Sequence, residues 1–220
     1  MRIELKASDG HTLSAWKTGP ADARQGLVVV QEIFGVNRHM RHVCETYAQQ
    51  GFAVVSPALF DRAERDAELG YTQEDVQKGL ALRGKITDAQ VMLDIEAAAA
   101  ALPAGIPLGI IGYCWGGTIA WWGATRSNSF RAAVGYYGGG IAATRQEVPH
   151  CPVQLHFGEE DKGIPQTDVE AIRAAQPGVE VFTYPGAGHG FSCEERPVYS
   201  PTDAMLAEQR SLGFFAQHLK

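Results

Sequence analysis

Short apolar runs bounded by polar or turn-forming residues recur along the chain. Each run is short enough for one strand and continuously apolar, as expected of parallel strands buried on both faces. We therefore predict strands at residues 27–30, 52–55, 108–111, 132–137, 153–158 and 179–184. Residues 1–6 instead alternate apolar and charged side chains, which is typical of an edge strand with one face in solvent.

Longer amphipathic segments lie between these runs. They predict helices at residues 38–50, 72–82, 87–102 and 201–218. Thr87 and Asp88 have the residue types of a helix start, as do Pro201 to Asp203. Alternating strands and helices predict an α/β fold, with a mostly parallel twisted sheet and helices on both faces. No repeat or linker interrupts this order, so we expect a single domain over residues 1–220.

The run at residues 108–111 leads directly into Gly112-Tyr113-Cys114-Trp115-Gly116-Gly117. A nucleophile on a sharp strand-to-helix turn needs small residues two positions before and after it, and Gly112 and Gly116 meet this need. Residues 118–122 can continue as a packed helix. The pattern predicts that Cys114 is a nucleophile; the alternative is a buried structural cysteine in a tight turn.

A thiol attacks only as its thiolate, so Cys114 needs a group that removes or holds its proton. In α/β-hydrolases the nucleophile is followed along the chain by an acid and then by a histidine. Glu159-Glu160-Asp161 follows one predicted strand, and His189 follows the next, between two glycines. We assign His189 as the proton shuttle and Asp161 as its orienting acid, while loop register leaves Glu159 and Glu160 as alternatives.

The strand at residues 27–30 is followed by the loop of residues 31–37. A loop after an early strand supplies one N–H of an oxyanion hole in this fold, and the residue after the nucleophile supplies the other. The backbone N–H groups of Ile33 and Trp115 are therefore the candidates. Glu32 is either a solvent-facing loop carboxylate or a desolvated base with a raised pKa beside the thiol.

Four segments together resemble the dienelactone hydrolase (carboxymethylenebutenolidase) family: residues 31–37, 112–117, 134–138 and 188–191. The resemblance covers essentially the whole chain. It implies one α/β-hydrolase domain that hydrolyses a lactone or small ester through a Cys-His-Asp triad and an acyl-enzyme. It also implies that Cys114 is the nucleophile, Asp161 the acid and His189 the base.

The resemblance gives Glu32 the role of a gating carboxylate. In that scheme the thiol stays neutral at rest, which limits its oxidation. A substrate carboxylate then draws an arginine away from Glu32, and Glu32 takes the thiol proton. The rivals are a general carboxylesterase or thioesterase of the same fold, and a non-catalytic binding or thiol-redox relative in which Cys114 pairs with Cys193.

The chain departs from the family pattern near His189. The family arginine in this loop corresponds to Cys193 here, and the family serine after the histidine corresponds to Gly190. Arg196 is a candidate replacement, and a second arginine falls in residues 71–83, where only Arg83 or Lys78 is available. These departures put the dienelactone substrate in doubt. The candidate substrate-binding residues are Phe34, Tyr137, Arg83, Phe191, Cys193 and Arg196.

Composition narrows the setting. The chain has 220 residues, 45% of them hydrophobic, and a net charge of −6, which argues against nucleic acid and anionic membranes as partners. No apolar stretch approaches the ~20 residues of a membrane span, and residues 1–6 do not have the apolar core of a signal peptide. Four scattered cysteines favour a reducing cytoplasm over a disulfide scaffold. We expect a monomer or small homo-oligomer.

Two further features complete the expectations. His39 and His42 are spaced for one helix face and Cys44 is near, but no second ligand pair follows at metal-site spacing. We therefore expect these histidines on a solvated helix face and predict neither a metal nor a cofactor. The irregular residues 60–69 and the helix that follows them are predicted to cap the pocket, which favours a small substrate.

Overall fold

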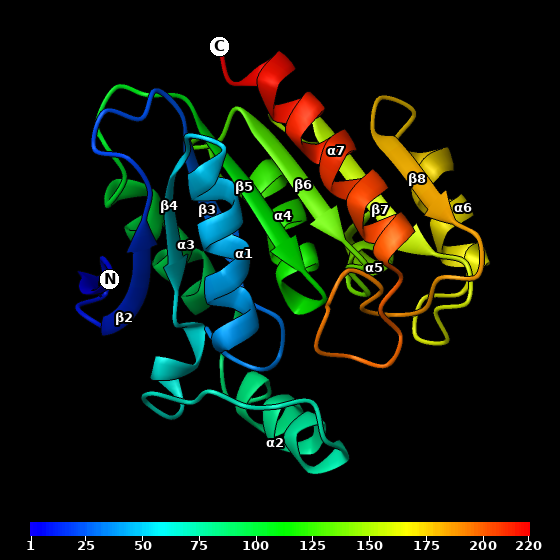
Figure 1. Ribbon diagram of the computed structural model, residues 1–220, viewed down its shortest axis with the longest axis horizontal. Helices are drawn as coiled ribbons and strands as arrows, with labels where there is room; N and C mark the ends of the chain where they lie inside the picture. Colours follow the sequence, from blue (N-terminus) through cyan, green and yellow to red (C-terminus); the bar gives the residue numbers. More distant parts are fainter.

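An eight-stranded sheet runs through the middle of the protein, and the computed structural model describes all of residues 1–220 (Figure 1). The strand order is β1-β2-β4-β3-β5-β6-β7-β8. The β1–β2 and β2–β4 pairs are antiparallel and the other five pairs are parallel, so the mostly parallel sheet and the N-terminal edge strand are confirmed. The strands are β1 (Arg2–Lys6), β2 (Thr12–Thr18), β3 (Gly26–Val30), β4 (Ala53–Pro57), β5 (Leu108–Tyr113), β6 (Ala132–Tyr136), β7 (Val153–Gly158) and β8 (Glu180–Tyr184).

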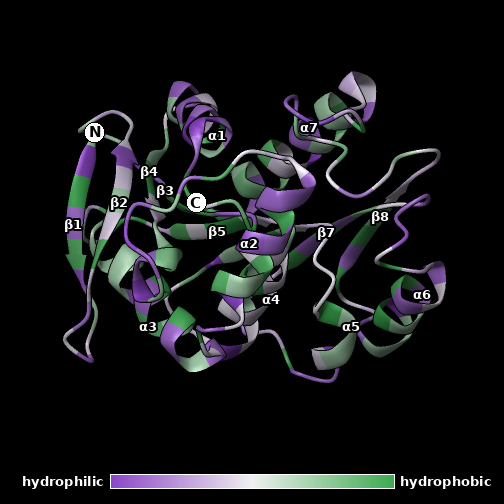
Figure 2. Ribbon diagram, turned by 90° about the horizontal axis from the view of Figure 1, so that it is seen from below, coloured by the Kyte–Doolittle hydropathy of each residue, from purple (hydrophilic) through white to green (hydrophobic).

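Helices cover both faces of the sheet, as the sequence predicts. Helices α1 and α7 lie on one face, and α3, α4, α5 and α6 lie on the other (Figures 1 and 2). The helices are α1 (Arg38–Gln49), α2 (Gln73–Arg83), α3 (Asp88–Ala100), α4 (Trp115–Arg126), α5 (Ile141–Thr144), α6 (Gln166–Ala175) and α7 (Pro201–His218). Helices α5 and α6 and the 3-10 turn Leu59–Arg62 were not predicted. None of the helices combines the length and apolar character needed to cross a membrane.

Side-chain caps explain where several helices begin. The Thr87 hydroxyl accepts a hydrogen bond from the Gln90 N–H, and the Gln90 side chain accepts one from the Thr87 N–H. Thr72 and Asp75 form the same reciprocal arrangement at the start of α2. Each arrangement pairs two backbone groups that the first helical turn otherwise leaves without partners. The predicted start at Thr87 is therefore confirmed.

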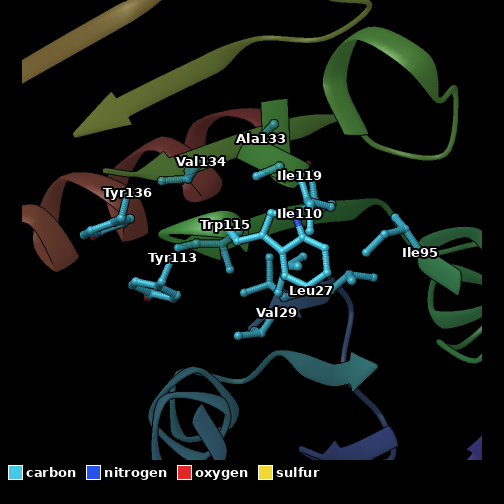
Figure 3. Packing of buried hydrophobic residues seen from close by; sticks show 14 of the residues in the cluster. Leu27, Val29, Ile95, Ile110, Tyr113, Trp115, Ile119, Ala133, Val134 and Tyr136 are labelled. Atoms are coloured by element: carbon cyan, nitrogen blue, oxygen red, sulfur yellow. The ribbon is translucent and has the colours of Figure 1, made fainter. Parts of the chain in front are cut away.

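The core lies between the central strands and the helices on each side. Every residue of β3 and nearly every residue of β5 is buried, which is why both strands are continuously apolar. Leu27 and Val29 from β3, Ile110 from β5 and Ile119 from α4 gather in one cluster (Figure 3). Because β3, β5, β6, β7 and β8 are parallel, the loops at their carboxyl ends all leave one edge of the sheet.

The segment from residue 60 to α2 packs against the loop that follows β3. The Leu69 N–H donates to the Phe34 carbonyl (2.9 Å), and Asn37 Nδ2 donates to the Leu69 carbonyl (3.0 Å). Gly79 of α2 lies so close to the Ile33 carbonyl that a Cβ at this glycine would overlap it. Helix α2 is thereby held apart from the sheet-covering helices (Figure 1) and beside the loop that carries Glu32.

Candidate active site

Cys114 occupies the sharp turn between β5 and α4. Its backbone has φ 56° and ψ −115°, a strained conformation for a residue with a side chain. Such strain costs roughly 1–3 kcal/mol and is concentrated at functional sites. A Cβ at Gly112 would overlap the Gly116 carbonyl, and a Cβ at Gly116 would overlap the Val30 carbonyl. Both flanking glycines are therefore required by the turn, as the sequence pattern predicts.

Asp161 and His189 meet at the ends of the loops after β7 and β8. His189 Nδ1 lies 2.7 Å from Asp161 Oδ2, and the Gly163 N–H donates to Asp161 Oδ1 at 2.8 Å. The Asp161 carboxylate is fully buried, whereas Glu159 and Glu160 are exposed. The geometry therefore pairs His189 with Asp161 and leaves the two alternative acids in solvent.

The charge state of His189 follows from its neighbours. Burial lowers its pKa, but hydrogen bonds with Asp161 and Cys114 and the electrostatic interactions with both outweigh that effect and raise the pKa to about 10. The imidazole therefore holds a second proton near neutral pH. A histidine in that state can donate a proton to a leaving group.

The proposed oxyanion-hole donors leave the sheet side by side. Val30 pairs with Gly112 in parallel register, so the loop after β3 and the turn at Cys114 begin at adjacent strand ends. Neither Ile33 nor Trp115 donates its backbone N–H to another group of the protein. Trp115 is the first residue of α4, where backbone N–H groups have no partner within the helix.

Glu32 is fully buried, which excludes the solvent-facing alternative. Its Oε2 accepts a hydrogen bond from the Tyr71 hydroxyl (3.2 Å), and that hydroxyl accepts one from Asn37 Nδ2 (3.2 Å). Burial and the Glu32 charge raise the pKa of Tyr71, so the phenol keeps the proton that it donates. Glu32 Oε1 has no hydrogen-bond partner; Arg196 Nη1 lies 3.9 Å away. A buried carboxylate paired this weakly is energetically costly.

The Arg196 side chain packs against Gly190 and places its guanidinium near Glu32. Gly190 has φ +86°, and a Cβ there would overlap the Arg196 guanidinium. The guanidinium carbon also lies 6.0 Å from the centre of the Tyr71 ring. Gly190 and the candidate replacement arginine are thus linked, because Gly190 leaves the space that Arg196 occupies.

Two other predicted residues lie against this arrangement. The Tyr137 ring is 5.1 Å from the His189 ring, and its hydroxyl is 2.8 Å from the Ser192 hydroxyl. Burial first, and then the charge of Glu32, raise the pKa of Tyr137. The Phe34 ring lies 4.6 Å from that of Tyr71 and is itself buried. The Tyr137 ring therefore packs against His189, and the Phe34 ring packs against Tyr71.

The remaining candidates differ in where they lie. The Arg83 guanidinium is 5.9 Å from the centre of the Trp115 ring, next to the turn that carries Cys114. Phe191 is fully buried among aromatic rings, 5.5 Å from the Tyr137 ring and 4.8 Å from the Tyr184 ring. Lys78 forms an exposed ion pair with Glu64. Cys193 is fully buried, and burial raises its pKa to about 12.

Tyr71 was not among the residues predicted for the site. His39 was predicted to lie on a solvated helix face. That interpretation of His39 is wrong, because its side chain is 3% exposed and burial lowers its pKa. The cue for His39 was its position beside Met40 on the buried side of α1. Tyr71 has a weaker cue, since it is an aromatic residue placed directly before the cap of α2.

The comparison with protein families gives a match over almost the whole chain. The model of the dienelactone hydrolase family matches residues 13–219. A carboxymethylenebutenolidase of Pseudomonas putida is 34% identical over an alignment 231 residues long. The alignment covers 97% of this chain and 95% of that protein. A provisionally named carboxymethylenebutenolidase of Synechocystis is 35% identical over 88% of this chain and 86% of its own length.

Solved structures agree with the sequence matches. A provisionally named dienelactone hydrolase of Klebsiella pneumoniae superposes with a TM-score of 0.83 at 31% identity, covering 99% of this chain and all of the other. An esterase of Pyrococcus furiosus shares the fold, with a TM-score of 0.73 at 16% identity. Sheet order, strand-end loops and matches over nearly the full length lead to one assignment: the chain belongs to the dienelactone hydrolase family of α/β-hydrolase enzymes.

Proposed function

We propose that this ester hydrolase cleaves small lactones or esters that carry a carboxylate, through an acyl-enzyme on Cys114. The observation that carries the proposal is the buried carboxylate of Glu32, held only loosely by Arg196 at 3.9 Å, at the same sheet edge as Cys114, His189 and Asp161. A loosely paired buried charge is available to change partners when a second anion arrives.

The first half of the reaction forms the acyl-enzyme. Glu32 takes the proton of the Cys114 thiol, and the thiolate attacks the ester carbonyl. The backbone N–H groups of Ile33 and Trp115 donate to the developing oxyanion, each contributing roughly 3–4 kcal/mol of transition-state stabilisation. The imidazolium of His189, favoured by its raised pKa, then protonates the leaving oxygen.

The second half releases the acid. His189 is neutral after it has protonated the leaving group, so it can take a proton from a water molecule. That water attacks the thioester, the Cys114 thiolate leaves and takes back the proton held by Glu32, and His189 returns to its protonated state. Asp161 holds the Nδ1 side of the ring throughout, which keeps Nε2 directed at the reacting atoms.

Arg196 links this chemistry to the charge of the substrate. A substrate carboxylate can accept two parallel hydrogen bonds from a guanidinium, which is a better interaction than the 3.9 Å contact with Glu32. Once Arg196 binds the substrate, Glu32 loses its nearest cation and becomes a stronger base. Substrate binding and thiol activation are then one event.

The test compares kcat/KM for a lactone that carries a carboxylate and for the methyl ester of the same lactone. We expect the wild type to favour the carboxylate, and Arg196→Ala to reduce that preference by roughly 10- to 100-fold, the value of a charged hydrogen bond. Lys6→Ala, which removes an exposed cation on the edge strand β1, is the matched control and should change neither value. A preference for the methyl ester, unchanged in Arg196→Ala, would instead identify a general carboxylesterase.

A further inference from the structure

Glu32 has two buried neighbours with metal-ligating chemistry, His39 and Cys193. One ligand atom of each residue lies within 4.8 Å of the ligand atoms of the other two. The three side chains come from separate segments: the loop after β3, the first turn of α1 and the loop before α7. All three residues are at most 3% exposed, so they form one enclosed cluster and not a patch of surface acids.

Two atoms of this cluster are polar, buried and unpaired. Glu32 Oε1 and His39 Nδ1 have no hydrogen-bond partner. Buried polar atoms in proteins are nearly always paired, and each exception calls for an explanation such as a missing ion. Cys193 adds a free thiol, which forms no disulfide. An oxygen, a nitrogen and a sulfur ligand therefore converge without satisfying one another.

We propose that Glu32, His39 and Cys193 form a binding site for a transition-metal ion, with Zn²⁺ as the best match. Zinc accepts this mixture of carboxylate, imidazole and thiolate ligands, and three protein ligands leave a fourth position open. Zinc bonds of about 2.0–2.3 Å require ligand atoms roughly 3.3–3.8 Å apart. The three side chains therefore have to approach one another by up to about 1.5 Å.

The charges of the loaded site balance. The Cys193 thiol releases its proton to solvent on binding, so one thiolate and the Glu32 carboxylate neutralise the doubly charged ion. Arg196 is the cation that the ion replaces. Its side chain is 21% exposed and has no other ion pair, so it can turn toward solvent. Zinc and Arg196 thus compete for the same carboxylate.

This competition gives the site a consequence for the enzyme. A bound ion occupies the lone pairs with which Glu32 would accept the thiol proton, so zinc acts as a reversible inhibitor and takes no part in the reaction. The binding itself does not depend on the proposed hydrolysis. It can be measured without a substrate.

The experiment titrates Co²⁺, a spectroscopic substitute for zinc, into the reduced full-length protein and follows the thiolate-to-cobalt charge-transfer absorption. Cys114→Ser is the background, because Cys114 and His189 are a second thiol and imidazole that could hold the ion. We expect the band in Cys114→Ser and its loss when Cys193→Ser is added. His39→Gln in the same background should weaken Co²⁺ binding at least about tenfold, since even supporting residues contribute that much.

Cys151→Ser is the matched control, because it removes a free thiol that is not in the cluster. It should leave the band and the affinity unchanged. Circular dichroism establishes that each variant folds, and Cys193→Ala provides a second substitution if Cys193→Ser does not. A band that persists without Cys193, a band that requires Cys114, or a Cys114→Ser protein that binds no Co²⁺ would each overturn the proposal.

Discussion

The candidate active site has two halves, a triad half of Cys114, Asp161 and His189 and a gate half of Glu32, Tyr71 and Arg196. The two halves differ in how completely their polar groups are paired. In the triad half, both carboxylate oxygens of Asp161 accept short hydrogen bonds, one of them shared with His189. In the gate half, Glu32 has one hydrogen bond at 3.2 Å and a distant contact with Arg196. The triad half joins loops that leave β5, β7 and β8 at one edge of the parallel sheet. The gate half adds Tyr71 and Arg196, which lie in longer connections between elements.

This difference predicts two kinds of variant. Substitutions in the triad half should abolish turnover of every substrate, because all of them use the same attacking and proton-transferring groups. Substitutions in the gate half should change which substrates are preferred. The following measurements test that division, beginning with the largest expected effect.

Replacing the nucleophile should have the largest effect. Cys114→Ala removes the attacking sulfur, and we expect kcat/KM to fall by at least about 10⁴-fold for charged and uncharged esters alike. Steady-state kinetics on both substrates measures this, with Cys151→Ser as a thiol control that retains wild-type rates. Wild-type activity in Cys114→Ala would contradict the acyl-enzyme proposal.

Removing the orienting charge should have the next largest effect. Asp161→Asn keeps the shape of the side chain but favours the wrong tautomer of His189, so we expect kcat to fall by roughly 10³–10⁴-fold. Glu159→Gln and Glu160→Gln change exposed carboxylates in the same loop and should leave kcat within about twofold. A larger loss in either control than in Asp161→Asn would reassign the acid.

A single methyl group can test the gate half. Gly190→Ala places a Cβ where the Arg196 guanidinium lies, so we expect kcat/KM to fall roughly tenfold for a carboxylated lactone and to stay unchanged for its methyl ester. Gly186→Ala is the matched control, because Gly186 also has a positive φ, at +75°, but has open space around it. Both variants should lose about 1 kcal/mol of stability. Equal losses on both substrates would show that Arg196 does not read the substrate charge.

The pH dependence of stability should reveal the pairing in the triad half. The pKa of His189 rises from 6.5 to about 10 on folding, so its stabilising contribution is complete below pH 6.5 and is lost as pH rises to about 10. We expect the free energy of unfolding to fall by up to about 5 kcal/mol across that window, since each pH unit within it costs about 1.4 kcal/mol. Urea denaturation at several pH values measures the slope. Asp161→Asn should flatten it, and a variant as steep as the wild type would contradict the assigned pairing.

The triad half was accessible from the sequence because it depends on local signals. The glycines around Cys114 are demanded by a turn that the structure realises at φ 56°. The strand order places the loops of Asp161 and His189 at one edge, and chain order was enough to choose them. Asp161 could not be separated from Glu159 by pattern alone, because only burial distinguishes the two carboxylates.

The gate half was only partly accessible. Arg196 was proposed as an anion clamp, but its approach to Glu32 depends on the path of the loop after His189 and on the space left by Gly190. Tyr71 and His39 were missed because their roles depend on contacts between segments far apart in the chain. Helices α5 and α6 were missed because their segments are short and no long apolar stripe marks them.

The close contact between Gly79 and the Ile33 carbonyl offers a means of redesigning the enzyme. A library that introduces alanine, serine and valine at position 79 would lift α2 away from the loop after β3 in graded steps. Such variants would shift the loop that carries Glu32 and Ile33 without substituting any residue of the site. Position 79 is therefore a place from which the geometry of the oxyanion hole can be tuned indirectly.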